Sequence, residues 1–198
     1  MTGTLKRALA VVPTLVPTAA LAHTGIGDTT GFLHGFAHPF GGLDHILAMV
    51  TVGILAFQLG GRALWLVPAT FVAVMAVGGW LGMLAVPVPY TEIGIALSIV
   101  VLGAAVALRL RAPVAVAMAL VGLFAVFHGH AHGAELPENA GGLAYGIGFM
   151  TATALLHAAG IALGFLAGWL AQAYDKAAVR VGGGLVVVAG LIILVQAV

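Results

Sequence analysis

Long apolar runs make up most of this chain, and short polar segments interrupt them. A helix needs about 20 predominantly apolar residues to cross about 30 Å of hydrocarbon. The runs show no alternation of apolar and polar residues, which argues against the strands of a membrane barrel. We therefore expect an all-α integral membrane protein, a bundle of about six transmembrane helices. The predicted helices cover residues 43–59, 64–84, 92–108, 113–128, 143–171 and 178–197.

The first 22 residues have the pattern of a secretory signal peptide. Two basic residues precede a short apolar stretch, and small residues at 20–22 suit cleavage. We expect residues 1–22 to be a cleavable signal peptide and residues 23–198 to form a single polytopic membrane domain. The alternative is an uncleaved first helix, but the apolar stretch is too short to span a bilayer.

The composition also indicates lipid as the solvent of this chain. Hydrophobic residues make up 62% and charged residues only 7%, whereas soluble domains carry about 25% charged residues. A net charge of +1 provides no basic surface for nucleic acid. The absence of cysteine excludes disulfides, thiolate metal ligands and cysteine nucleophiles.

The basic residues predict the orientation of the helices. If the mature N-terminus lies outside and the chain crosses six times, every basic residue after the signal peptide falls in an inner connection. Both termini then lie outside, and seven of the eight histidines gather at the outer face. The basic residues concerned are Arg62, Arg109, Arg111, Lys176 and Arg180.

Two histidines precede the first predicted helix. His34 and His38 are four residues apart, so they would share one face of a helical turn. Pro39 biases His38 away from helical geometry. We therefore expect a bent segment here, with a regular helix that resumes just before Asp44.

Asp44 and His45 would lie in the first turn of that helix, with Met49 one turn further on the same face. Nitrogen and oxygen donors without thiolate suit Ni(II), Co(II) or Zn(II), and the Met49 thioether makes copper a further candidate. The structural alternative is that Asp44 is a helix N-cap and His45 its interfacial neighbour. Ionisable residues next to membrane spans are usually functional, which favours a metal site.

A second group of histidines follows the fourth apolar run. His128 and His132 would share a helix face if the helix continues, whereas His130 would point elsewhere. Because the fourth run is short, we expect its helix to continue into these histidines. The alternative is a histidine-rich loop that binds metal weakly or not at all.

One histidine lies deep in the predicted membrane region. His157 is about 14 residues, or roughly 21 Å, into the fifth predicted helix. It is either a packing residue hydrogen-bonded to a neighbouring helix or a relay for an ion in transit. Thr151 and Thr153 are candidate hydrogen-bond partners inside the bundle.

At these residues the chain resembles the HupE/UreJ family of nickel or cobalt permeases. The resemblance implies a secondary transporter of the bacterial inner membrane that supplies metal to hydrogenase or urease maturation. The family's metal motif would map onto His38, Asp44 and His45, and less surely onto residues 128–132. The resemblance covers essentially the whole mature chain and rests on His38-Pro39, on Gly42-Leu43-Asp44-His45, on His128 to Glu135 and on Leu156-His157.

The leading hypothesis is thus a transporter and not an enzyme, with Ni(II) as substrate and no organic cofactor. Co(II), Zn(II) and copper are the other candidate ions. The alternative is an intramembrane zinc hydrolase built from the aspartate and histidines, and a metal sensor or assembly factor is a third possibility. The candidate metal-binding residues are His23, His34, His38, Asp44, His45, His128, His130, His132 and His157.

Overall fold

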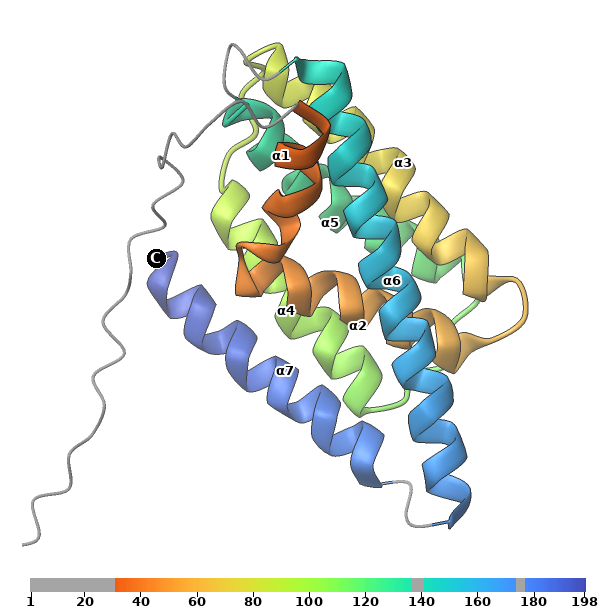
Figure 1. Ribbon diagram of the computed structural model, residues 1–198. Helices are drawn as coiled ribbons and strands as arrows, with labels where there is room; N and C mark the ends of the chain where they lie inside the picture. Colours follow the sequence, from red (N-terminus) through yellow and green to blue (C-terminus); the bar gives the residue numbers. More distant parts are fainter. Residues whose placement is uncertain (1–30, 137–140, 174–176) are drawn as a thin grey trace, which may run out of the picture.

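The computed structural model describes residues 31–136, 141–173 and 177–198, which form helices and no strands (Figure 1). This confirms the all-α prediction for the described part of the chain. The predicted signal peptide and His23 lie outside these residues. The helices are α1 (Gly31–Ala37), η1 (His38–Phe40), α2 (Leu43–Leu59), α3 (Ala63–Met83), α4 (Thr91–Ala107), α5 (Val114–Ala134), α6 (Gly142–Ala173) and α7 (Ala177–Gln196), of which η1 is a short 3-10 helix.

Several helices are suited to a membrane. By length and composition, α3, α5, α6 and α7 can each cross a bilayer. The segment from α1 to α2 passes the same test as one broken span with a bend of 81°, and α4 is a shorter apolar helix. The prediction of a multi-pass membrane protein is therefore confirmed, while the count of six crossings stays a prediction.

The helices follow the apolar runs closely, and α5 extends beyond its run. It continues through the histidines to Ala134, as the shortness of the run predicted. The alternative prediction of a histidine-rich loop is therefore wrong, because residues 128–132 belong to a regular helix.

The bend between α1 and α2 has a local cause. Pro39 lies in η1, and the Gly41 amide closes this turn by donating to the His38 carbonyl at 2.9 Å. Gly42 is extended (φ −113°, ψ 126°) and occupies the N-cap position of α2. The alternative in which Asp44 caps this helix is wrong, because Asp44 lies inside the first turn and no side-chain cap bond forms.

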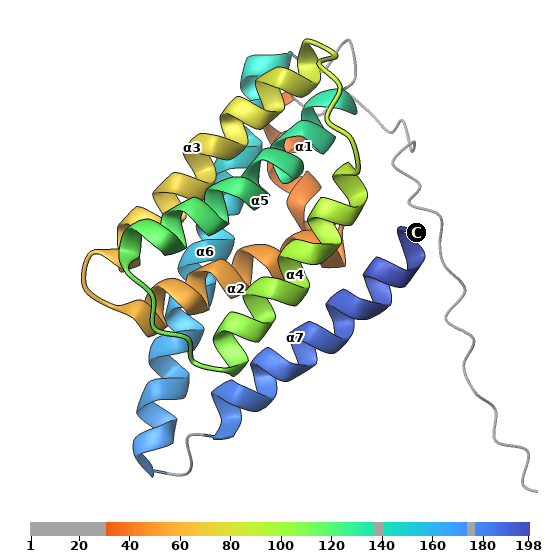
Figure 2. The ribbon, with the colours of Figure 1, turned by 180° about the vertical axis from the view of Figure 1, so that it is seen from behind.

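Glycines allow α3 and α5 to approach closely. A Cβ atom at Gly129 would collide with the backbone of Met75, and one at Gly133 with that of Gly79. Small residues of this kind are typical of tight helix packing in membranes. Gly133 lies four residues after Gly129, and its contact Gly79 lies four residues after Met75. The helices α3 and α5 therefore run in the same direction (Figure 2).

The helices α4 and α7 also pack through glycines, in opposite directions. Gly103 of α4 lies against Val186, whereas Ala107 lies against Gly183 of α7. The pair is visible as two neighbouring helices in Figure 2.

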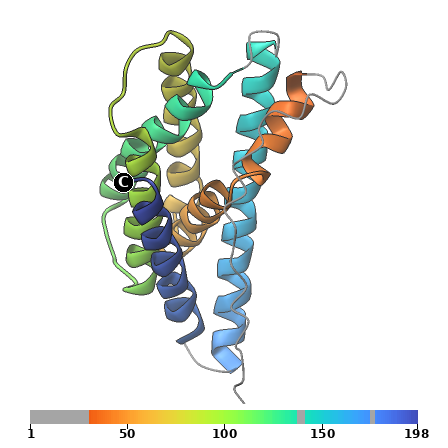
Figure 3. The same ribbon diagram turned by 90° about the vertical axis from the view of Figure 1, so that its left-hand side faces the viewer.

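The long helix α6 supports the bent segment. Gly148 packs on the backbone of Phe32 in α1, and Gly160 packs on that of Val50 in α2. The helices α1 and α2 therefore lie in turn along α6 (Figure 3). Because α2 also contacts α3 and α4, it lies inside the bundle, and His45, Ala48 and Met49 near its start are buried.

Candidate metal centre

Three histidines converge where α2 begins. Nε2 of His45 lies 2.5 Å from Nε2 of His132 and 3.3 Å from Nδ1 of His128. His128 and His132 are one turn apart on α5, and all three side chains are buried. The structure thus brings together residues that are more than 80 positions apart in the sequence.

Asp44 holds the ring of His45. Its Oδ2 atom lies 3.2 Å from Nδ1 of His45, so we assign the proton of the neutral ring to Nδ1, which donates a hydrogen bond to the carboxylate. Nε2 of His45 is then unprotonated and turns its lone pair towards the other two histidines. Carboxylates that orient metal-binding histidines act in this way in many metal sites.

Ser98 of α4 holds the ring of His128 in the same manner. The Ser98 hydroxyl donates to the Ile95 carbonyl at 2.6 Å, so its oxygen accepts from Nε2 of His128 at 3.0 Å. The proton of His128 is assigned to Nε2 from this pattern. Nδ1 of His128 is therefore the unprotonated nitrogen, and it faces His45.

Two imidazole lone pairs consequently point at one small region. Unprotonated nitrogens cannot hydrogen-bond to each other, and they repel unless a proton or a cation lies between them. Two nitrogens bound to one transition-metal ion at about 2.0–2.1 Å lie roughly 3.0–3.4 Å apart. The 3.3 Å spacing between His45 and His128 fits this requirement. The 2.5 Å spacing between His45 and His132 is shorter, so these two rings have to move apart before both can bind one ion.

A second set of candidate ligands adjoins the first. His38, His132 and Glu135 can place one ligand atom each within 4.8 Å of one another. The His38 and His132 rings are 4.6 Å apart between centroids. His38 is half-buried and Glu135 is exposed. We call these residues the outer trio, and His45, His128 and His132 the inner trio; the two share His132.

Other candidate histidines lie apart from these trios. His130 lies 2.8 Å from the Val86 carbonyl and 3.5 Å from the Thr91 hydroxyl, so it points elsewhere, as predicted. The ring of His34 lies against Tyr145, with 5.7 Å between centroids, and 6.5 Å from that of His38.

His157 is deeply buried near the middle of α6, with 1% of its surface exposed. Its ring lies against Phe71 of α3, with 5.2 Å between centroids. Thr153 is buried, and its hydroxyl donates to the sulfur of Met75 at 3.8 Å. The prediction that Thr151 is a hydrogen-bond partner inside the bundle is wrong, because Thr151 is exposed and its hydroxyl donates to the Ile147 carbonyl.

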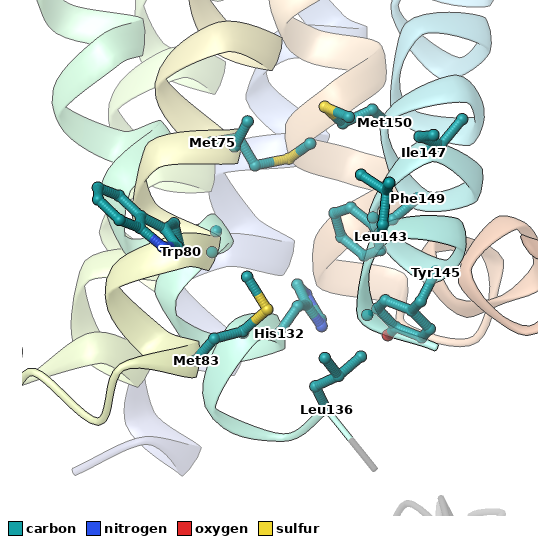
Figure 4. Close-up of a pocket in the computed structure, with 16 residues that line it drawn as sticks. Met75, Trp80, Met83, His132, Leu136, Leu143, Tyr145, Ile147, Phe149 and Met150 are labelled. Atoms are coloured by element: carbon teal, nitrogen blue, oxygen red, sulfur yellow. The ribbon is translucent and has the colours of Figure 1, made fainter. Parts of the chain in front are cut away.

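A cavity of about 330 Å³ opens beside His132 (Figure 4). Its walls are mostly apolar, and they include the three methionines Met75, Met83 and Met150. Nδ1 of His132 is buried and has no hydrogen-bond partner among the described residues. The cavity therefore flanks the residue that belongs to both trios.

Sequence reasoning missed several residues of this site. Ser98 is the only serine of the chain, and a lone hydroxyl in an apolar run is a signal that could have found it. Glu135 ends the histidine motif but was not among the candidate ligands. Phe71 carries no such signal, because its role depends on how α3 packs against α5 and α6.

Comparison with known proteins identifies the family. The HupE / UreJ protein family matches residues 9–193. The chain is 47% identical over 180 residues to Protein HupE of Rhizobium leguminosarum bv. viciae, which covers 91% of this chain and 92% of that protein. No solved structure gives a significant match. The family consists of metal transporters and not of enzymes, which disfavours the hydrolase alternative. The chain therefore belongs to the HupE / UreJ family.

Proposed function

We propose that this protein is a secondary transporter that imports a divalent transition-metal ion, nickel or cobalt, across the bacterial inner membrane. One observation carries the proposal: Nε2 of His45 and Nδ1 of His128, which we assign as unprotonated, face each other at 3.3 Å. Two contacts impose this arrangement, from Asp44 and from Ser98. Family membership supports metal transport in general.

The proposed topology has six crossings, with α1 and α2 as one broken span and both termini outside. The directions of the packed helices support it, because α3 and α5 run in parallel while α4 and α7 are antiparallel. Arg62, Arg109 and Arg111 then lie in inner connections, in agreement with the positive-inside rule. The two trios lie towards the outer side in this orientation.

The ion would bind in two steps from outside. The outer trio offers an exposed carboxylate, Glu135, and the half-buried His38. The ion then transfers to the buried inner trio, with His132 as a ligand in both positions. Because His132 is a ligand in both positions, the ion stays bound to the protein while it transfers between them.

The donor set supports nickel or cobalt as substrate. Imidazole and carboxylate ligands without thiolate suit these ions, whereas Cu(I) prefers sulfur donors. We further propose that the imported metal serves hydrogenase or urease maturation, which rests on the resemblance to the family alone.

The test is uptake of radioactive nickel by cells that express the protein at matched membrane levels. We expect His45→Ala to abolish uptake, because it removes the residue that contacts both other members of the inner trio. Asp44→Ala is expected to reduce uptake at least tenfold, because His45 loses its orienting partner. His130→Ala is the control, because this histidine points away from both trios.

Uptake that both His45→Ala and Asp44→Ala retain would contradict the proposed site. If the intact protein takes up neither nickel nor cobalt above the level of empty cells, the proposed function is wrong.

A further inference from the structure

His157 has an unusual environment for a buried histidine. Only 1% of its surface is exposed, yet neither ring nitrogen has a hydrogen-bond partner among the described residues. A neutral imidazole carries one donor and one acceptor, and buried polar atoms are nearly always paired. A packing histidine bonded to a neighbouring helix, which was one prediction from the sequence, would not leave both nitrogens free.

Other donor atoms lie on the same side of α6. Thr153 precedes His157 by one helical turn, and the two therefore share a face. This face lies against α3, where Met75 contacts Thr153 and Phe71 contacts His157. An imidazole, a hydroxyl and a thioether are thus gathered between α3 and α6.

One aromatic ring contacts both this group and the inner trio. The centroid of Phe71 is 5.6 Å from that of His128 and 5.2 Å from that of His157. Phe71 is completely buried. His128 and His157 therefore contact the same ring, and an ion that moves from the inner trio to His157 passes next to Phe71.

We propose that His157, together with Thr153 and Met75, forms a third and transient binding station for the transported metal ion, next to Phe71. This inference rests on the proposed function and extends it from capture to passage through the membrane. A station with one imidazole and two weak donors binds the ion less tightly than the inner trio. Weak binding is suitable here, because conduction requires that each site release the ion again.

The first experiment compares uptake with binding in His157→Leu. This substitution fills the position with an apolar side chain and removes both ring nitrogens. We expect the maximal rate of nickel uptake to fall at least tenfold. The affinity of the purified protein for nickel, which the inner trio determines, should change less than twofold. A role in folding alone would not separate the two quantities in this way.

Uptake is measured in two further sets of variants, in case His157→Leu fails to reach the membrane. His157→Gln retains a polar ligand atom and is expected to keep a measurable part of the uptake. Thr153→Val should lower the uptake rate at least threefold, whereas Thr151→Val should not, since the Thr151 hydroxyl is exposed and bonds within its own helix.

Uptake by His157→Leu above half that of the intact protein would overturn the station. Parallel loss of nickel binding and uptake in both His157 variants would also overturn it, because His157 would then support the structure only. If the intact protein neither binds nor transports nickel, the proposed function itself is wrong. If the intact protein transports nickel and the His157 variants do so equally well, only the binding station at His157 is wrong.

Discussion

Ser98 determines which nitrogen of His128 faces the other histidines. Its oxygen is available to accept from His128 only because its own proton is donated to the Ile95 carbonyl. Asp44 does the same for His45. At the scale of single residues, the centre therefore depends on two hydrogen-bond acceptors as much as on the imidazoles they orient.

We predict that Ser98→Ala weakens nickel binding by about 10- to 100-fold, the usual cost of losing a partner that orients a metal ligand. The change removes no imidazole, so the number of bound ions should stay the same. Calorimetric titration of the purified protein measures both quantities.

The matched control for Ser98→Ala is Thr151→Ala, which also removes a hydroxyl that donates to a helix carbonyl, but on an exposed face. Equal affinities of Ser98→Ala and the control would show that Ser98 does not orient His128.

The sequence predicted the chemistry of these residues better than their arrangement. Asp44 and His45 are neighbours, so their association was expected, but the side of His45 on which Asp44 lies was not. The partnership of Ser98 with His128 joins α4 to α5 and depends on helix packing. These helices are apolar on nearly all sides, so no hydrophobic stripe indicates which face meets a neighbour.

At the scale of elements, glycines hold the α5 histidines in place. A Cβ atom at Gly129 would collide with the backbone of Met75, and Gly129 directly follows His128 in the sequence. Backbone atoms cannot move aside as a flexible side chain can. The close packing of α3 and α5 is thus a condition for the inner trio.

Gly129→Ala is predicted to destabilise the protein by about 1–3 kcal/mol, as overpacking of interiors typically does. It should also weaken nickel binding, because α5 has to move away from α3. Thermal unfolding in detergent and nickel titration measure the two effects.

Gly184→Ala serves as the control for this variant, because no atom lies within 4 Å of the added Cβ. A thermal midpoint of Gly129→Ala at or above that of the control would argue against this role of the interface.

The element boundaries were largely predictable, because apolar run length and membrane thickness limit them to a few residues. The exception is α1, Gly31–Ala37, which with seven residues is too short to stand out as an apolar run. Its position follows from packing of Gly35 and Gly148 across the α1–α6 contact. The bend before α2 was predictable, because Pro39 and Gly42 are local signals.

At the scale of the whole molecule, the proposed transport route requires one orientation in the membrane. The connection between α3 and α4 should face outside, and the connection between α4 and α5 should face inside. The chain has no cysteine, so single cysteines can report on each side.

We predict that a membrane-impermeant maleimide labels Val86→Cys in intact spheroplasts but labels Leu110→Cys only after permeabilisation. Both side chains are exposed in the structure, so access depends on the membrane and not on the fold. Labelling of Leu110→Cys alone, or of both variants, in intact spheroplasts would contradict the orientation.

In the proposed transporter, His45, His128 and His132 together bind the transported ion. X-ray absorption spectroscopy of the nickel-loaded protein tests it most directly, because it detects imidazole rings around the metal. We predict three imidazole nitrogens at roughly 2.1 Å, and two in His128→Leu. A spectrum without imidazole scattering, or one unchanged by His128→Leu, would contradict the claim.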